Sequence, residues 1–194
     1  MRLRQPVDFL RWLAFACLAI LCLGSFSYIF YQNDWKLTTE RPRPAGYPQT
    51  PARLSAEAPQ LVLYHFYSPT CPCSRFVWPE VEALAKQYQG RVKVVAVSAE
   101  PDPDARAGLR PVIDTSEALA RSMGIYCTPQ AVLVGPQGQV LYTGTYNRAR
   151  FCNDGQTAFV AQALHDYYKR GNVRKPKGPV YGCLLPALQR KEAS

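Results

Sequence analysis

Two cysteines one residue apart, Cys71 and Cys73, follow an apolar run and precede a helix-like stretch. A strand that delivers a thiol to a helix N-terminus places it near unpaired backbone N–H groups and the positive end of the helix dipole, which both stabilise the thiolate. The thiolate is the form that attacks disulfides and binds metals, so the sequence predicts a reactive or metal-ligating pair. The neighbouring Pro69 and Pro72 disfavour the alternative of two structural cysteines in the core.

Hydrophobic periodicity predicts the elements that position this pair. Apolar residues at Val77, Val81, Leu84 and Tyr88 form one helical stripe interrupted by Pro79. The predicted order is strand 60–67, helix 74–89, strand 91–98, short strand 109–113, helix 115–123 capped by Asp114 or Thr115, strands 131–134 and 140–145, and a last helix near 159–167. This order predicts an α/β fold with a mixed central sheet and helices on both faces.

The residues in this order resemble the thioredoxin-like superfamily, in particular the redoxin type that is tethered in bacterial envelopes. Pro79 follows Cys71 by eight positions, as the kinking proline of thioredoxins follows their first active-site cysteine. Thr128-Pro129, followed by a strand-turn-strand segment, is similar to the family's cis-proline segment. The resemblance implies a thioredoxin-like fold, Cys71 as the attacking thiol, and a backbone at Thr128-Pro129 that pairs with a substrate strand.

The sequence departs from the family pattern at the second cysteine. The usual motif is C-x-x-C, but Ser74 stands at its last position and Cys73 stands one residue earlier. Either Cys73 resolves Cys71 through a tight C-x-C disulfide, or a distant thiol does so. His65 occupies the place of the buried acid of thioredoxins, where it could exchange a proton with the resolving thiol. The alternative for His65 is a core histidine bonded to the backbone.

The remaining cysteines outside the N-terminal apolar segment are Cys127, Cys152 and Cys183. The Gly182-Cys183 ending resembles a Gly-Cys tail that follows the last helix in some redoxin-type proteins. A Cys152–Cys183 disulfide would attach that tail to the domain and would stabilise it by roughly 3–4 kcal/mol. Cys127 could replace either partner, so the connectivity stays open.

A segment of twenty residues from Trp12 to Tyr31 contains no charged side chain and is long enough to span a bilayer as a helix. Arg2, Arg4 and Arg11 precede it, which favours a cytoplasmic N-terminus. The sequence therefore predicts an uncleaved signal-anchor. We expect a single-pass protein of the bacterial inner membrane whose C-terminal domain lies in the periplasm.

Composition divides the chain into four parts. Residues 1–32 form the anchor, and residues 33–59, with five prolines, are expected to form an extended tether. Residues 60–170 form the thioredoxin-like domain, and residues 171–194 form a basic tail with the Gly-Cys ending. The net charge of +9 is attributed to a solvated basic surface, and no motif indicates nucleic acid binding.

The leading functional hypothesis is a membrane-tethered thiol–disulfide oxidoreductase that acts through Cys71 on protein thiols or disulfides of the cell envelope, with no cofactor. The alternative is a thioredoxin-like Cu(I) chaperone that binds the metal with Cys71 and Cys73. That alternative lacks a third ligand, because His65 is expected to be buried and His165 lies on the last predicted helix.

Overall fold

The computed structural model describes residues 6–32, 40–48, 60–103, 109, 111–148, 151, 154–174 and 180–192. The chain forms two compact units, Met1–Thr39 and Glu40–Ser194. The first contains helix α1, Pro6–Phe30, which includes Trp12 and ends one residue before Tyr31. Its segment Phe9–Phe30 is long and apolar enough to cross a membrane by length and composition. At 1.5 Å per residue it measures roughly 33 Å, about the thickness of a bilayer core.

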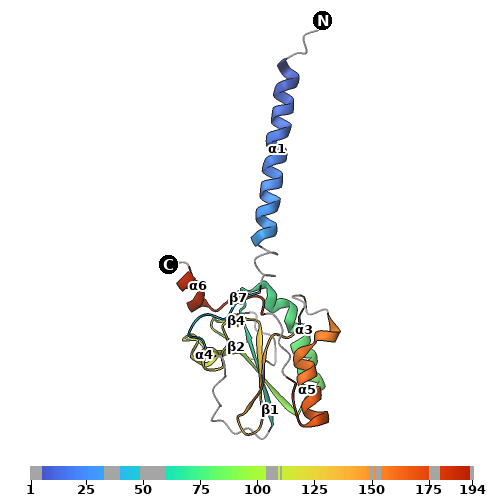
Figure 1. Cartoon of the computed structure of the whole chain (residues 1–194), viewed down its shortest axis with the longest axis vertical. Helices are drawn as coiled ribbons and strands as arrows, with labels where there is room; N and C mark the ends of the chain where they lie inside the picture. Colours follow the sequence, from blue (N-terminus) through green and yellow to red (C-terminus); the bar gives the residue numbers. More distant parts are fainter. Residues whose placement is uncertain are drawn as a thin grey trace. The chain divides into compact units, whose positions relative to one another are not determined.

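A five-stranded mixed sheet forms the centre of the second unit, in the order β3-β2-β1-β5-β6. Strands β1, β2 and β3 are parallel to one another (Figure 1). Strand β5 pairs antiparallel with β1, and β6 pairs antiparallel with β5. The central β1 is nearly continuously apolar because both of its faces are covered. The strands are β1 Leu61–Tyr67, β2 Val92–Ser98, β3 Val112–Ile113, β5 Gln130–Val134 and β6 Val140–Gly144.

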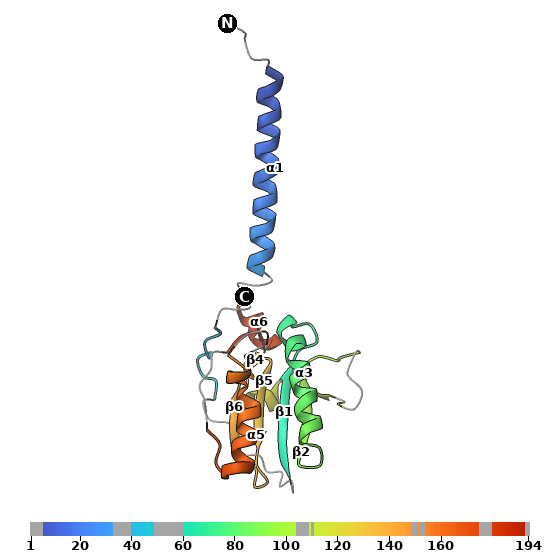
Figure 2. The same cartoon turned by 90° about the vertical axis from the view of Figure 1, so that its right-hand side faces the viewer.

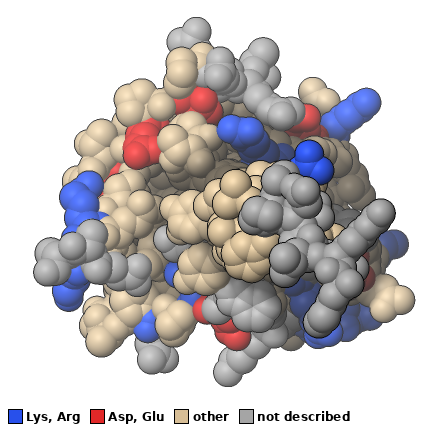
Figure 3. Space-filling view, turned by 90° about the horizontal axis from the view of Figure 1, so that it is seen from above, with Lys and Arg blue, Asp and Glu red and all other residues tan. Residues whose placement is uncertain are grey.

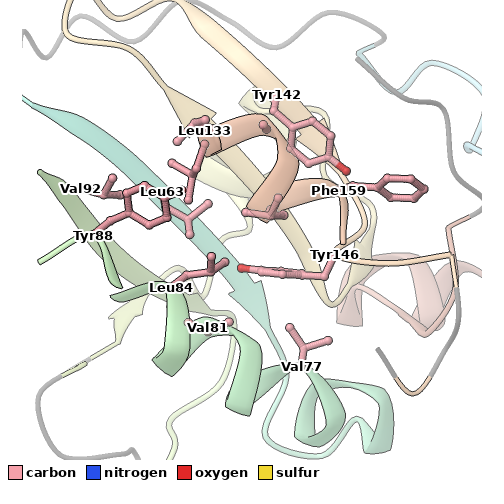
Figure 4. Packing of buried hydrophobic residues seen from close by; sticks show 14 of the residues in the cluster. Leu63, Val77, Val81, Leu84, Tyr88, Val92, Leu133, Tyr142, Tyr146 and Phe159 are labelled. Atoms are coloured by element: carbon pink, nitrogen blue, oxygen red, sulfur yellow. The ribbon is translucent and has the colours of Figure 1, made fainter. Parts of the chain in front are cut away.

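Helices cover both faces of this sheet, as the sequence predicts. Helices α3, Pro72–Gln87, and α5, Phe159–Arg170, lie side by side over one face (Figure 2). Their apolar side chains meet those of the sheet in one core, where Leu63, Val81 and Tyr146 lie close together (Figure 4). The short helix α4, Ala118–Ser122, contributes to a second core on the opposite face. The protein therefore has the predicted thioredoxin-like fold.

Residues 40–48, which the sequence assigns to the tether, lie against the domain instead. The Arg41 backbone N–H donates to the Val180 carbonyl at 2.7 Å, and Arg43 Nη1 donates to the Gly124 carbonyl at 2.8 Å. Tyr47 is buried and packs edge-on against Tyr126. These contacts make the segment part of the domain, since they satisfy its donors and bury an aromatic ring. The rest of the predicted tether, 33–39 and 49–59, lies outside the described residues.

Residues 171–194, which the sequence predicts to be a basic tail, are partly folded onto the domain. Its part 180–192 forms strand β7, Cys183–Leu184, and helix α6, Pro186–Glu192, and both dock on the domain. Leu184 and Leu185 are buried, and the buried Glu117 accepts a hydrogen bond from the Ala187 N–H at the start of α6. On the face seen in Figure 3, basic and acidic side chains are both scattered among the other residues. Residues 175–179 and 193–194 lie outside the described part of the chain.

Candidate active site

Cys71 lies in the short loop between the end of β1 and the start of α3. It is the N-cap of that helix, with an extended backbone, and Pro72 takes the first helical turn. The Cys71 N–H donates to the Ser68 carbonyl at 3.2 Å, and the Ser74 N–H donates to the Cys71 carbonyl at 3.0 Å. Ser74 Oγ in turn accepts the Ser68 N–H at 3.2 Å. Ser74, at the family's second cysteine position, thus closes the loop that holds Cys71.

The surroundings of the Cys71 sulfur favour its thiolate. Hydrogen bonds from the Cys183 thiol and, second, from the Cys73 thiol lower the pKa of Cys71, and burial only partly opposes them. The backbone N–H groups of Cys73 and Ser74 at the helix start act in the same direction. The Thr128 carbonyl oxygen lies 3.5 Å from Cys71 Sγ and accepts its hydrogen when the thiol is protonated. These contacts favour the thiolate form of Cys71, and its role as the attacking thiol stays a prediction.

The surroundings of Cys183 and Cys127 raise their pKa values and so favour the protonated thiols. The pKa of Cys183 is raised, first by its hydrogen bond to Cys71, then by burial and by the negative charge of the neighbouring thiolates. Burial, followed by the charge of Cys71, raises the pKa of Cys127. The opposite shifts of the two pKa values favour a state in which Cys71 is the thiolate and Cys183 keeps its proton.

A second small sheet brings Cys183 to this place. Strand β4, Cys127–Thr128, pairs antiparallel with β7, so that Thr128 faces Cys183 and Cys127 faces Leu184. The Thr128-Pro129 peptide bond is cis, as predicted from the resemblance. Thr128 Oγ1 donates to the Cys183 carbonyl at 3.4 Å.

Cys183 is a free thiol in the structure and lies beside Cys71. The pairing of β7 with β4 places it opposite Thr128, and the disulfide with Cys152 stays a prediction. Cys152 lies outside the described residues. The signal that could have located Cys183 is weak: a glycine, Gly182, followed by the apolar Leu184 and Leu185.

His65 is completely buried in the core between the sheet and α3. Its ring stacks on Tyr67 and meets Trp78 and Tyr146 edge-on, and its Nδ1 lies 3.0 Å from the Tyr146 hydroxyl. Burial lowers the pKa of His65 to about 3, so the ring is neutral near pH 7. Among its described contacts none is with a cysteine, so the proton-exchange role stays a prediction. The alternative prediction is a core histidine bonded to the backbone; the described partner of the ring is the Tyr146 side chain.

Within the described residues, no group of three or more His, Cys, Asp or Glu side chains is arranged to hold a metal ion. His165 is exposed on α5, where its Nδ1 lies 4.0 Å from Asp166 Oδ1. His165 is therefore not placed to join Cys71 and Cys73 as a ligand of the Cu(I) hypothesis.

Comparison with known proteins agrees with this description. The family model described as "Domain of unknown function (DUF6436)" matches residues 44–186. Thioredoxin 1 of Nostoc sp. is 43% identical over 42 residues, which are 22% of this chain and 39% of that protein. Thioredoxin of Synechocystis sp. is 39% identical over 51 residues, 26% of this chain and 46% of that protein. The chain thus spans less than half the length of these curated relatives.

A solved structure with a similar fold covers more of the chain. The crystal structure of an uncharacterized conserved protein from Geobacillus kaustophilus superposes with a TM-score of 0.55 at 18% identity. It covers 75% of this chain and 90% of its own. At this level of identity the similarity concerns the fold alone.

Proposed function

The chain belongs to the DUF6436 family, and we propose that it is a thiol–disulfide oxidoreductase whose attacking group is the Cys71 thiolate. The observation that carries the proposal is the position of Cys71. It caps a helix, receives hydrogen bonds that lower its pKa, and lies beside the cis Thr128-Pro129 bond. A low-pKa thiolate is the species that attacks a disulfide.

In the proposed reaction Cys71 attacks one sulfur of a substrate disulfide. The substrate S–S bond breaks, one substrate sulfur stays attached to Cys71 as a mixed disulfide, and the other leaves as a thiolate that takes up a proton. Cys73 or another thiol then attacks the Cys71 sulfur and releases the second substrate thiol. The substrate gains two electrons and two protons, and the protein gains one disulfide. The reverse sequence would oxidise a substrate dithiol.

We further propose that α1 anchors the protein in the bacterial inner membrane and that the domain acts in the periplasm on protein thiols or disulfides. The length and composition of Phe9–Phe30 and the preceding Arg2 and Arg4 support this orientation. Reporter fusions joined after Asp34 should be active only outside the cytoplasm. Fusions that are active only in the cytoplasm would reverse the proposed topology.

The activity can be tested with the reduced full chain in detergent and a model peptide that contains one disulfide. The wild-type chain should form a mixed disulfide and release the reduced peptide, whereas Cys71→Ser should do neither. Cys17→Ser, which removes a thiol of α1, is the matched control and should react at the wild-type rate. A Cys71→Ser chain that still reduces the peptide would exclude the mechanism. Stoichiometric Cu(I) binding without any covalent intermediate would favour the chaperone instead.

A further inference from the structure

Strand β7 occupies the edge of the site at which a substrate strand is expected. The thioredoxin-like resemblance implies that a substrate pairs with the backbone before the cis-proline. In this chain the backbone at Thr128 already has a partner, because Thr128 faces Cys183 in the antiparallel pair of β4 and β7. The chain thus supplies its own strand at that edge, with a cysteine at the residue that faces the reactive sulfur.

Contacts on both sides of Cys183 hold it there. Before it, Arg41 Nε donates to the Gly182 carbonyl at 3.2 Å, and Cys127 Sγ donates to the Tyr181 carbonyl at 3.4 Å. After it, the Leu185 N–H donates to the Tyr126 carbonyl at 3.1 Å. None of these contacts uses the Cys183 sulfur. The placement is therefore a property of the folded backbone, and the thiol stays free to react.

Gly182 permits the close approach of the two strands. Its φ of +116° lies in a region that residues with a side chain rarely adopt. A Cβ added at this position would meet the Thr128 carbonyl oxygen, which is the same atom that lies next to Cys71 Sγ. Only glycine lets β7 lie this near to Thr128, and that proximity brings Cys183 to Cys71.

Resting on the proposed function, we propose that Cys183 is the resolving thiol of Cys71, and that β7 is a built-in strand which presents it. After a substrate disulfide has reacted, Cys183 attacks the Cys71 sulfur. The Cys71–substrate bond breaks, a Cys71–Cys183 disulfide forms, and the proton of Cys183 passes to the second substrate thiol. The substrate disulfide is the oxidant in this cycle, and an external dithiol restores the reduced pair.

The electrostatics of the pair fit this order of events. The hydrogen bond to Cys71 and the charge of its thiolate hold Cys183 protonated before the reaction. Both influences end when Cys71 enters a neutral mixed disulfide, so Cys183 becomes more acidic at the step at which it must attack. Cys73 also reaches Cys71, but a bond between them must close across the first turn of α3, where Ser74 donates to the Cys71 carbonyl. Cys183 lies on the separate strand β7, so a bond from it to Cys71 does not have to close across that turn.

Disulfide mapping tests the proposal directly. The reduced full chain in detergent is reacted with one equivalent of the disulfide peptide, quenched with acid, and digested with trypsin. Cys71 and Cys73 fall in the same tryptic peptide, 54–75, whereas Cys183 falls in the peptide 178–190. We expect the two peptides to be joined. An internal Cys71–Cys73 disulfide would overturn the inference and leave the proposed function intact, whereas a chain that forms no disulfide at Cys71 would overturn both.

Substitutions separate the attack from the release. Cys183→Ser should still form the mixed disulfide, but release of the second peptide thiol should slow by about 100-fold or more, because a positioned thiol has a high effective concentration. Cys73→Ser should release it at nearly the wild-type rate. The opposite pattern would assign the resolving role to Cys73.

A glycine pair tests the role of β7 without removing any thiol. Gly182→Ala should lower the yield of the Cys71–Cys183 disulfide at least several-fold, whereas Gly155→Ala, at which a Cβ meets nothing within 4 Å, should not change it. Wild-type yield in Gly182→Ala would show that the β4–β7 pairing does not position Cys183. The Cys183→Ser result decides the matter independently if Gly182→Ala does not fold.

Discussion

The buried His65 makes the domain acid-sensitive in a way that can be calculated. Its pKa is lowered from 6.5 to about 3 by complete burial, so between these values the unfolded chain binds a proton that the folded chain does not. Stability due to this group is therefore fully present above pH 6.5 and falls as the pH decreases toward 3. Linkage gives a loss of about 2 kcal/mol between pH 7 and pH 5 from this residue alone.

His65→Phe should remove this term while keeping an aromatic ring in the core. At pH 7 the variant should be less stable by about 1 kcal/mol, because the hydrogen bond with Tyr146 is lost. At pH 5 it should be more stable than the wild type by about 1 kcal/mol, the difference between these two amounts. The two stability curves should therefore cross between pH 7 and pH 5.

The measurement is urea unfolding of the full chain in detergent, followed by tryptophan fluorescence, at both pH values. Other titrating groups cancel when wild type and variant are compared. His165→Gln is the control, because the second histidine of the chain is exposed on α5. Equal losses of unfolding free energy in wild type and His65→Phe would refute the assignment of a neutral, buried ring.

Three further predictions concern the thiols and the docking of β7 and α6. Cys183→Ala should raise the pH at which Cys71 ionises, measured by thiolate ultraviolet absorbance, because it removes the strongest hydrogen-bond donor; an unchanged midpoint would contradict this, and Cys17→Ala is the control. Ser74→Cys restores the C-x-x-C spacing of thioredoxins, so peptide mapping should find Cys71 bonded to the new thiol and less Cys71 bonded to Cys183. Glu117→Ala should weaken the start of α6 by about 1 kcal/mol and raise the hydrogen exchange of β7, which would otherwise stay protected.

Local pattern is enough to predict much of the domain and half of the site. The strand before Cys71, the stripe on α3 and the hairpin of β5 and β6 all follow from periodicity and turn residues over short stretches of sequence. The spacing from Cys71 to Pro79 and the Thr128-Pro129 segment are likewise local features. They locate the proposed nucleophile and the cis-proline because the fold imposes these intervals along the chain.

The other half depends on pairings that no local pattern encodes. Strand β7 has two residues, too few for an alternation of apolar and polar side chains, and its partner β4 lies 55 residues earlier at Thr128. Residues 40–48 are polar and rich in proline, which is typical of a tether, yet Arg41 and Arg43 find carbonyl acceptors on the domain. Both segments are held by a few long-range contacts, which composition does not reveal.

Docking of β7 and ionisation of Cys71 must favour each other, because docked β7 supplies a hydrogen-bond donor and the Cys71 thiolate supplies its acceptor. The Cys183 thiol lowers the pKa of Cys71, so by linkage the Cys71 thiolate must tighten the hold on Cys183 by the same free energy. Docking of β7 should be strongest at pH values above the lowered pKa of Cys71 and below about 8.5, near which the Cys183 thiol of an undocked β7 loses its own proton. Cys71 is only 1% exposed while β7 is docked. We therefore expect extended peptides, which could displace the two-residue ladder and pair with Thr128, to react with Cys71 faster than small disulfides do.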